Sequence, residues 1–262
     1  MEEHSVIQVG GTVEKAVKGE YRIDVKAVLS EGWQLTKASR ISINLGLMFC
    51  IALGMLITFT VSQYFGGIEA IFKDQQAFTL LNIVVTLIIY PFLVGVEMMG
   101  VFHSVGIKTH PKLVFGFLKR GSWVAICALF ASTLTSIGLS LLILPGVYLI
   151  VALSLVLPLV AEKRMSPVKA IMVSLQATRH QWFSLFAIYL ALFFIFVLCF
   201  VPVQLFASSG VPMVGGVITI LILSFLAPMF YNVKGILYRE IFGMQLALSK
   251  GTSGSVDSTF SA

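Results

Sequence analysis

The segment from Trp123 to Ala161 is almost entirely apolar and contains no Asp, Glu, Lys or Arg. A soluble domain rarely keeps so long a stretch free of charge, whereas two antiparallel membrane helices joined by a tight turn require one. Leu144, Pro145 and Gly146 interrupt the run, and Pro followed by Gly suits a type II turn, whose third residue takes a positive φ. The segment therefore predicts a helical hairpin in a membrane.

Six segments are long or apolar enough to cross a bilayer, and they predict an all-α polytopic membrane protein. The composition agrees, because hydrophobic residues make up 58% of the chain and charged residues only 11%. The fourth segment is short for a hydrocarbon core of about 30 Å, but flanking charges can extend a span by snorkelling. We expect it to cross, because otherwise the later basic segments would lie on opposite sides. The predicted spans are 41–65, 78–102, 123–144, 147–161, 182–206 and 214–233.

The distribution of Lys and Arg predicts the orientation in the membrane. Six lie in residues 1–40, four in 103–122, four in 162–181 and three after the sixth span, whereas the loops on the other side contain only Lys73. Basic loops remain on the cytoplasmic side, so both termini are expected there. No signal peptide is expected, since the first 40 residues lack an apolar stretch of the required length.

This orientation divides the chain into three parts. We expect a cytoplasmic segment 1–22, a six-span membrane domain 23–245 and a tail 246–262 that is rich in Ser, Gly and Thr and disordered. The net charge of +6 is explained by the Lys and Arg residues that set the orientation, so no nucleic-acid partner is predicted.

An internal repeat is predicted from short amphipathic stretches that precede the first, third and fifth spans. Each contains basic residues and a Trp, and the three read DVKAVLSEGWQLTKASR, PKLVFGFLKRGSW and SPVKAIMVSLQATRHQW. The second helix of each hairpin carries a proline, at Pro91, Pro158 and Pro228, where a kink or break is expected. The pattern indicates three units of an interfacial helix followed by a helical hairpin, and coincidence is the alternative.

The sequence LPGVYLIVALSLVLPLVAEKRMSPVKAIMVSLQATRHQWFSLF resembles a pattern of bacterial six-span inner-membrane proteins of the YciC type. The shared features are the Leu-Pro-Gly hairpin, the following Pro and Glu, and an amphipathic helix. These proteins look related to the membrane domain in front of some glycerophosphodiester phosphodiesterases. The resemblance is clearest over residues 140–190 and extends weakly over 20–245. It implies a six-span fold in a bacterial inner membrane more than an activity, because its motifs are architectural and the phosphodiesterase chemistry belongs to an attached soluble domain.

The residues that usually carry catalysis do not form a recognisable group. The four histidines, His4, His103, His110 and His180, make no HExxH motif or close metal-ligand cluster. No P-loop or GxGxxG motif is present. We therefore expect no catalytic residue, no metal and no cofactor. Residues 41–62, 78–96 and 182–233 also lack the charges that ion-coupled carriers place near the midplane, which disfavours proton-driven transport.

Three acidic residues, Glu97, Glu162 and Glu240, lie near the cytoplasmic ends of the even-numbered predicted spans. One interpretation makes them part of a lipid-headgroup or solute site. The other pairs them with basic residues of the interfacial stretches, for instance Lys119 or Arg179. Pairing is favoured, because separated single acids form no catalytic dyad.

Seven basic residues on the amphipathic stretches form what we call the basic collar. They are flanked by Trp123 and Trp182, and they are expected to face anionic lipid headgroups or to set the topology alone. The collar comprises Lys112, Lys119, Arg120, Lys163, Arg164, Lys169 and Arg179.

Small residues recur every four positions in the third span, at Ala128, Ser132, Ser136 and Ser140. They predict close helix packing within the chain, with a homodimer seam as the alternative. The expected partners are membrane lipids, and a homo-oligomer or another membrane protein is possible. The sequence thus favours a non-enzymatic membrane protein that organises lipids or partners. A carrier for a lipid or amphipathic solute is the alternative, and an intramembrane enzyme is the least supported.

Overall fold

The computed structural model describes residues 6–207 and 211–247, and it is almost entirely helical. Six helical segments are long and apolar enough to cross a membrane, which confirms the predicted all-α polytopic class. The segments are α2 (Val25–Tyr64), α4 (Gln75–Ser104), α5 (Gly121–Leu141), α6 (Ile143–Ala152) with α7 (Val156–Ala161), α9 (Trp182–Leu198) with α10 (Val201–Ala207), and α11 (Pro212–Phe242).

Shorter elements connect these helices. They are β1 (Val6–Val9), α1 (Val13–Lys18), α3 (Ile68–Lys73), the 3-10 helices η1 (Pro111–Phe115) and η2 (Leu118–Arg120), α8 (Pro167–Thr178), the 3-10 helix η3 (Arg179–Gln181), and β2 (Met244–Ala247). β1 and β2 pair in an antiparallel sheet, in which Val9 lies opposite Met244. The predicted tail boundary at residue 246 is therefore wrong, because the chain is still a strand there. Residues 248–262, which were predicted to be disordered, lie outside the described residues.

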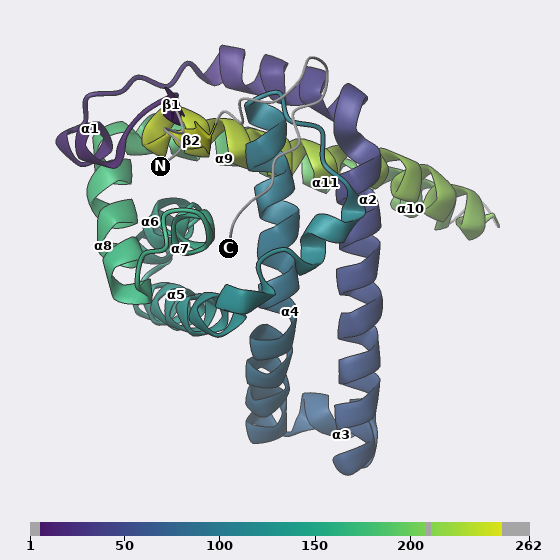
Figure 1. The fold of residues 1–262 in the computed structure, drawn as a ribbon. Coiled ribbons are helices and arrows are strands. Elements are labelled where there is room, and N and C mark those ends of the chain that lie inside the picture. Colours follow the sequence, from purple (N-terminus) through teal and green to yellow (C-terminus); the bar gives the residue numbers. More distant parts are fainter. Residues whose placement is uncertain (1–5, 208–210, 248–262) are drawn as a thin grey trace.

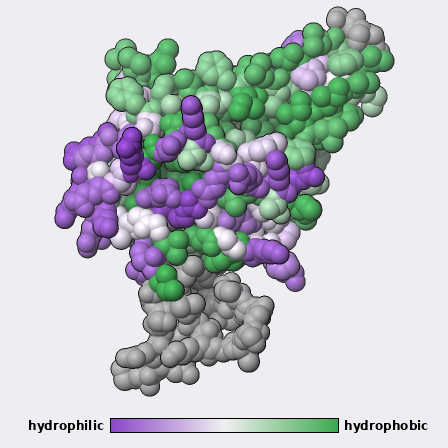
Figure 2. Space-filling view, turned by 90° about the horizontal axis from the view of Figure 1, so that it is seen from above, coloured by the Kyte–Doolittle hydropathy of each residue, from purple (hydrophilic) through white to green (hydrophobic). Residues whose placement is uncertain are grey.

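The three hairpins extend in different directions from one region (Figure 1). The α2–α4 hairpin points down, α10 and α11 extend to the right, and the hairpin of α5 with α6 and α7 is seen nearly end-on. From above, hydrophilic residues gather on one side, and apolar residues cover the two arms that leave it (Figure 2). We use the name polar face for β1, α1, β2 and the connections 105–120 and 162–166, which together contain eight Lys and Arg residues.

The apolar helices bury little of their surface against one another. In the most apolar windows, 17% of the residues are buried in α2 and 28% in α11, compared with 56% in the segment Ile143–Ala161. Most of this surface therefore faces outward, as expected for helices whose surroundings are lipid. The fourth span, which the sequence left in doubt, is the most enclosed of these helices.

The centre of the fold is the crossing of α4 and α11. A Cβ atom on Gly235 would lie 2.1 Å from the carbonyl oxygen of Gly100, and one on Gly100 would lie 2.1 Å from the carbonyl oxygen of Tyr231. Only glycine permits backbones to approach so closely. α2 packs beside this crossing, where a Cβ atom on Gly32 would lie 2.5 Å from Cγ2 of Val233.

The interfacial helix predicted before the first span is not a separate element. Asp24 caps α2 by accepting hydrogen bonds from the backbone N–H groups of Lys26 and Ala27, and the helix then continues to Tyr64. No proline interrupts it, so the amphipathic stretch and the span form one helix. The second stretch forms η1 and η2, and the third forms α8 and η3. The three units therefore begin with different structures.

The Leu-Pro-Gly turn predicted at residues 144–146 is wrong. Leu142 alone separates α5 from α6, and it is extended, with φ −159° and ψ 147°. Pro145 then lies in the first turn of α6, where a missing N–H removes no intrahelical bond. Gly146 provides close packing rather than a positive φ, because a Cβ atom there would lie 2.7 Å from the Cα atom of Leu139.

The three predicted proline sites differ in their effect. Pro158 is the third residue of α7, and residues 153–155 just before it interrupt the span. This agrees with the lost hydrogen bond, because proline has no N–H to donate to the carbonyl of residue 154. Pro91 and Pro228, in contrast, lie inside α4 and α11, which continue through them, so the predicted break does not occur there.

The small residues of α5 do not all pack within the chain. Ala128 is buried, but Ser132, Ser136 and Ser140 are exposed. The expectation of intrachain packing is therefore wrong for the three serines. In a membrane protein, an exposed face of this kind is turned toward lipid or another chain.

Candidate functional site

A buried ion pair joins α4 to α11 beside their crossing. Nζ of Lys234 lies 2.6 Å from Oε1 of Glu97, and the side chains are 9% and 6% exposed. The sequence prediction had ended the last span at Val233 and counted Lys234 with the following segment. Because α11 continues to Phe242, the lysine is instead enclosed by the helices, and Glu97 is paired.

The other two predicted acids are also held by the last turns of α11. The hydroxyl of Tyr238 donates to Oε2 of Glu162 over 2.8 Å, and Lys163 lies 3.2 Å from the same carboxylate. Nη2 of Arg239 lies 2.7 Å from Oε1 of Glu240. The acids are thus engaged as the pairing interpretation expected, but their partners are Lys234, Tyr238, Lys163 and Arg239 rather than the expected Lys119 and Arg179.

Arg239 connects the polar face to α2. Its Nη1 and Nη2 atoms lie 2.6 and 3.0 Å from the two carboxylate oxygens of Glu31, a bidentate arrangement. The same guanidinium donates to the carbonyl of Ser104 at the end of α4. Arg239 therefore fixes three helices, α2, α4 and α11, relative to one another.

A second polar network holds the loop that follows α4. The Nδ1 atom of His103 lies 3.0 Å from Oδ1 of Asn232, and its Nε2 atom lies 2.8 Å from Oγ1 of Thr109. Thr109 donates in turn to Oγ of Ser42, and the amide of Asn232 donates to Oγ1 of Thr36. His103 is therefore used in packing, and no cluster of metal-ligating side chains occurs within residues 6–207 and 211–247.

Thr109 of this network and Glu162 both line a pocket of about 710 Å³ on the polar face. We call it the basic pocket. Its walls come from the end of α4, the 105–120 connection and the end of α7. The lining residues are Phe102, Ile107, Lys108, Thr109, His110, Leu113, Gly116, Phe117, Lys119, Arg120, Ala161, Glu162 and Arg164.

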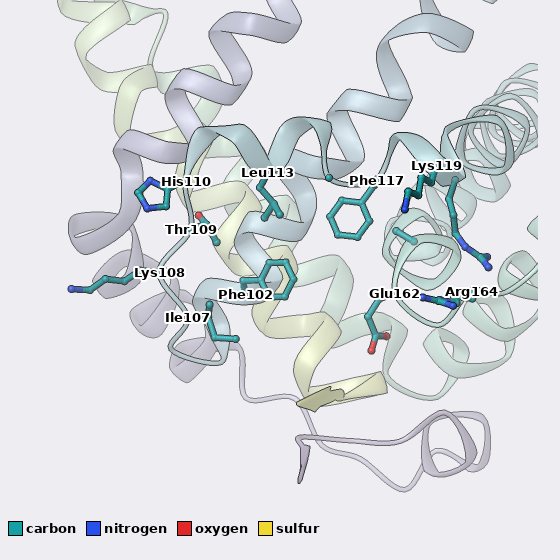
Figure 3. A pocket seen from close by; sticks show the side chains of 13 residues that line it. Phe102, Ile107, Lys108, Thr109, His110, Leu113, Phe117, Lys119, Glu162 and Arg164 are labelled. Carbon is teal, nitrogen blue, oxygen red and sulfur yellow. The ribbon is translucent and has the colours of Figure 1, made fainter. Parts of the chain in front are cut away.

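The pocket has an apolar middle and one charged side. Phe102 and Phe117 lie between the loop of Lys108 and the group of Lys119, Glu162 and Arg164 (Figure 3). Lys108 points away from this middle, whereas Arg164 points toward Glu162. With Arg120, the charged side has three cations and one acid, so it favours an anion. We call Lys119, Arg120 and Arg164 the cation triad.

Arg164 has an unusual backbone conformation. Its φ is 54°, in the left-handed region, where a residue with a Cβ atom is uncommon and costs about 1 kcal/mol or more. The turn between α7 and α8 holds this conformation and directs the side chain along the wall of the pocket (Figure 3). Non-glycine residues in this region cluster at binding sites, which is consistent with a role for Arg164.

The seven residues of the predicted basic collar do not all lie in one place. Lys119, Arg120 and Arg164 meet at the pocket, and Lys163 lies beside Glu162. The remaining members, which are exposed and lie on other parts of the chain, are Lys112, Lys169 and Arg179. The sequence had missed Phe102, Phe117 and Lys108, although Lys108 belongs to the basic segment 103–122.

No family model, curated protein or solved structure matches this chain. The resemblance to YciC-type proteins therefore stays a prediction. The function is argued from the pocket itself, which combines an anion-binding wall with an aromatic floor at the edge of the apolar helices.

Proposed function

We propose that this membrane protein binds the headgroup of an anionic phospholipid in the basic pocket, and so organises lipid around its polar face without catalysing a reaction. The observation that carries the proposal is the cation triad beside an apolar floor. In this proposal the polar face is cytoplasmic, the orientation that the Lys and Arg distribution favours.

Electrostatics supports this ligand class. A cationic side chain near an anionic lipid surface contributes about 1 kcal/mol, so three together contribute about 3 kcal/mol, or on the order of 100-fold in affinity. Arg presents a fork of donors that matches a phosphate, and Lys adds a point charge. Glu162 accepts a hydrogen bond from Tyr238 and serves to hold α7 against α11, which supports binding rather than acid–base chemistry.

The test compares two variants with the same loss of charge. The pocket variant carries Lys119→Gln, Arg120→Gln and Arg164→Gln, and the control carries Lys112→Gln, Lys169→Gln and Arg179→Gln. Native mass spectrometry of protein from the same membranes measures retained phosphatidylglycerol and cardiolipin. We expect the pocket variant to lose most of this lipid and the control to retain it.

Two results contradict the proposal. An equal loss in both variants would show a diffuse attraction to the membrane surface without a pocket. Unchanged retention in both would leave the collar as a topology signal. Topology is checked in each variant first, because orientation depends on the same kind of residue.

A lipid carrier is the second candidate, and the buried Glu97–Lys234 pair favours it. Charged residues among membrane helices often mark a transport pathway. The interruption of the fourth span at residues 153–155 also provides a place where a helix can bend. A scrambling assay with fluorescent phospholipid in reconstituted vesicles tests this function, which predicts transfer between leaflets that the double variant Glu97→Gln with Lys234→Met reduces.

A further inference from the structure

A second hollow of about 480 Å³ lies between α4 and α5, next to the basic pocket. We call it the apolar groove. Its walls are mainly aliphatic and aromatic, and several of these side chains are about two-fifths exposed. The residues that provide them are Leu87, Ile88 and Phe92 of α4, Leu118 of η2 and Ile126 of α5.

Two glycines bring the connection between the spans close to α4, and one of them, Gly121, lines the groove together with Pro91. A Cβ atom on Gly121 would lie 3.1 Å from Cβ of Pro91, so α5 begins in direct contact with α4. A Cβ atom on Gly95 would lie 2.6 Å from Cα of Val114, so η1 is also pressed against α4. The connection between the spans is thereby held at the surface of α4. It lines both hollows, the basic pocket and the apolar groove.

The groove and the basic pocket are lined by successive residues of one short segment. Leu118 and Gly121 line the groove, whereas Lys119 and Arg120 line the pocket. Because a 3-10 helix rises about 2.0 Å per residue and has three residues per turn, the backbone of these four residues rises only about 6 Å, and the two hollows border different faces of one turn. A single molecule with an anionic head and an apolar chain can therefore occupy both hollows.

We propose that the apolar groove holds one acyl chain of the lipid whose headgroup occupies the basic pocket. This inference rests on the proposed function and names its ligand as an intact phospholipid rather than a soluble phosphate. The triad supplies the charge complementarity, and the groove lies among residues of α4 and α5, where a chain can enter from the bilayer.

The groove contributes selectivity rather than strong attraction. An acyl chain is surrounded by hydrocarbon in the bilayer as well, so moving it into the groove removes no apolar surface from water. What the groove adds is closer packing against a fixed protein surface. Filling the groove should therefore lower the affinity for phospholipid by about tenfold, less than removal of the triad.

The experiment fills the groove from Ser122, an exposed residue of α5 that lines it. The variant is Ser122→Trp, and the matched control is Ser136→Trp, another exposed serine of the same helix outside the groove. Two probes are titrated in detergent, phosphatidylglycerol and its water-soluble headgroup, glycerophosphoglycerol. Native mass spectrometry measures the first, and competition against bound phosphatidylglycerol measures the second.

We expect Ser122→Trp to weaken phosphatidylglycerol binding about tenfold and to leave glycerophosphoglycerol binding unchanged, while Ser136→Trp changes neither. The triad variant should weaken both probes. Unchanged phosphatidylglycerol binding in Ser122→Trp would overturn the acyl-chain site while the proposed function stands. Equal weakening of both probes by Ser122→Trp would also overturn it. If the triad variant binds both probes normally, the proposed function itself fails.

Discussion

The carboxylate of Glu97 on α4 lies 2.6 Å from the ammonium of Lys234 on α11, with both side chains buried. The two residues are 137 positions apart in the chain, so the contact exists only when the first and last hairpins have packed together. A buried ion pair is a weak source of net stability, because the loss of hydration offsets the attraction. Replacing only one of the two residues is nevertheless costly, because the remaining buried charge then has no partner.

The first prediction concerns this pair. Glu97→Gln and Lys234→Met should each destabilise the protein by about 3–5 kcal/mol, because each leaves a polar or charged group without its partner. The double variant, which removes both charges, should be more stable than either single variant. Thermal unfolding in detergent measures the difference, with the exposed Glu69→Gln as control. A double variant as unstable as the sum of the singles would contradict the pairing.

The crossing of α4 and α11 gives a second prediction. Gly235→Ala places a Cβ atom 2.1 Å from the backbone oxygen of Gly100, so the helices must separate. We expect destabilisation of about 1–3 kcal/mol or more. Gly216→Ala is the control in the same helix, because nothing lies within 4 Å of its added Cβ atom. That control should be neutral or slightly stabilising, since alanine favours a helix over glycine.

A third prediction concerns Tyr21, whose hydroxyl donates to the carbonyl of Ala177 over 2.8 Å. Burial raises the pKa of Tyr21 to about 12, above the value of about 10 expected in the unfolded chain. Its contribution to stability is therefore complete below pH about 10 and is lost as the pH rises through about 12.

Replacement of this tyrosine should show the same dependence. Tyr21→Phe should lower the stability by about 1 kcal/mol at neutral pH, and the difference from the parent protein should shrink above pH about 10. Unfolding curves recorded at several pH values measure it. Tyr64→Phe, at a position 85% exposed, should match the parent throughout.

The fourth prediction is the topology. Reporter fusions should alternate, beginning outside and ending inside the cell, and a periplasmic signal at Arg164 would contradict the assignment of the fourth span. The fusion sites, in order, are Gly66, Lys108, Leu142, Arg164, Ser209 and Ala247.

The class of fold was predictable because membrane spans are recognised from the local hydropathy of the sequence alone. The six apolar helices of the structure correspond to the six apolar segments. The hairpin turn was not, because Pro145 fits either a type II turn or the first turn of a helix. The choice depends on how Gly146 packs against Leu139, which is a tertiary contact.

The candidate site was predictable only in part. Lys119, Arg120 and Arg164 were recognised as basic residues next to spans, but their meeting in one pocket depends on how the hairpins converge. The role of Lys234 was missed because the predicted sixth span ended just before this charge, whereas helix α11 continues past it to Phe242. The spacing of Lys234 to Tyr238 and Arg239, on successive turns of one helix, was the available signal.

The pairing of β1 with β2 has a consequence for the path of the chain between them. Two strands can form a sheet at a membrane surface only if both lie on the same side, so the number of crossings between Val9 and Met244 must be even. If the interrupted span from Ile143 to Ala161 stopped halfway while the other five crossed, the count would be odd and the sheet could not form. The four residue pairs of this small sheet therefore constrain the whole membrane domain to an even number of crossings.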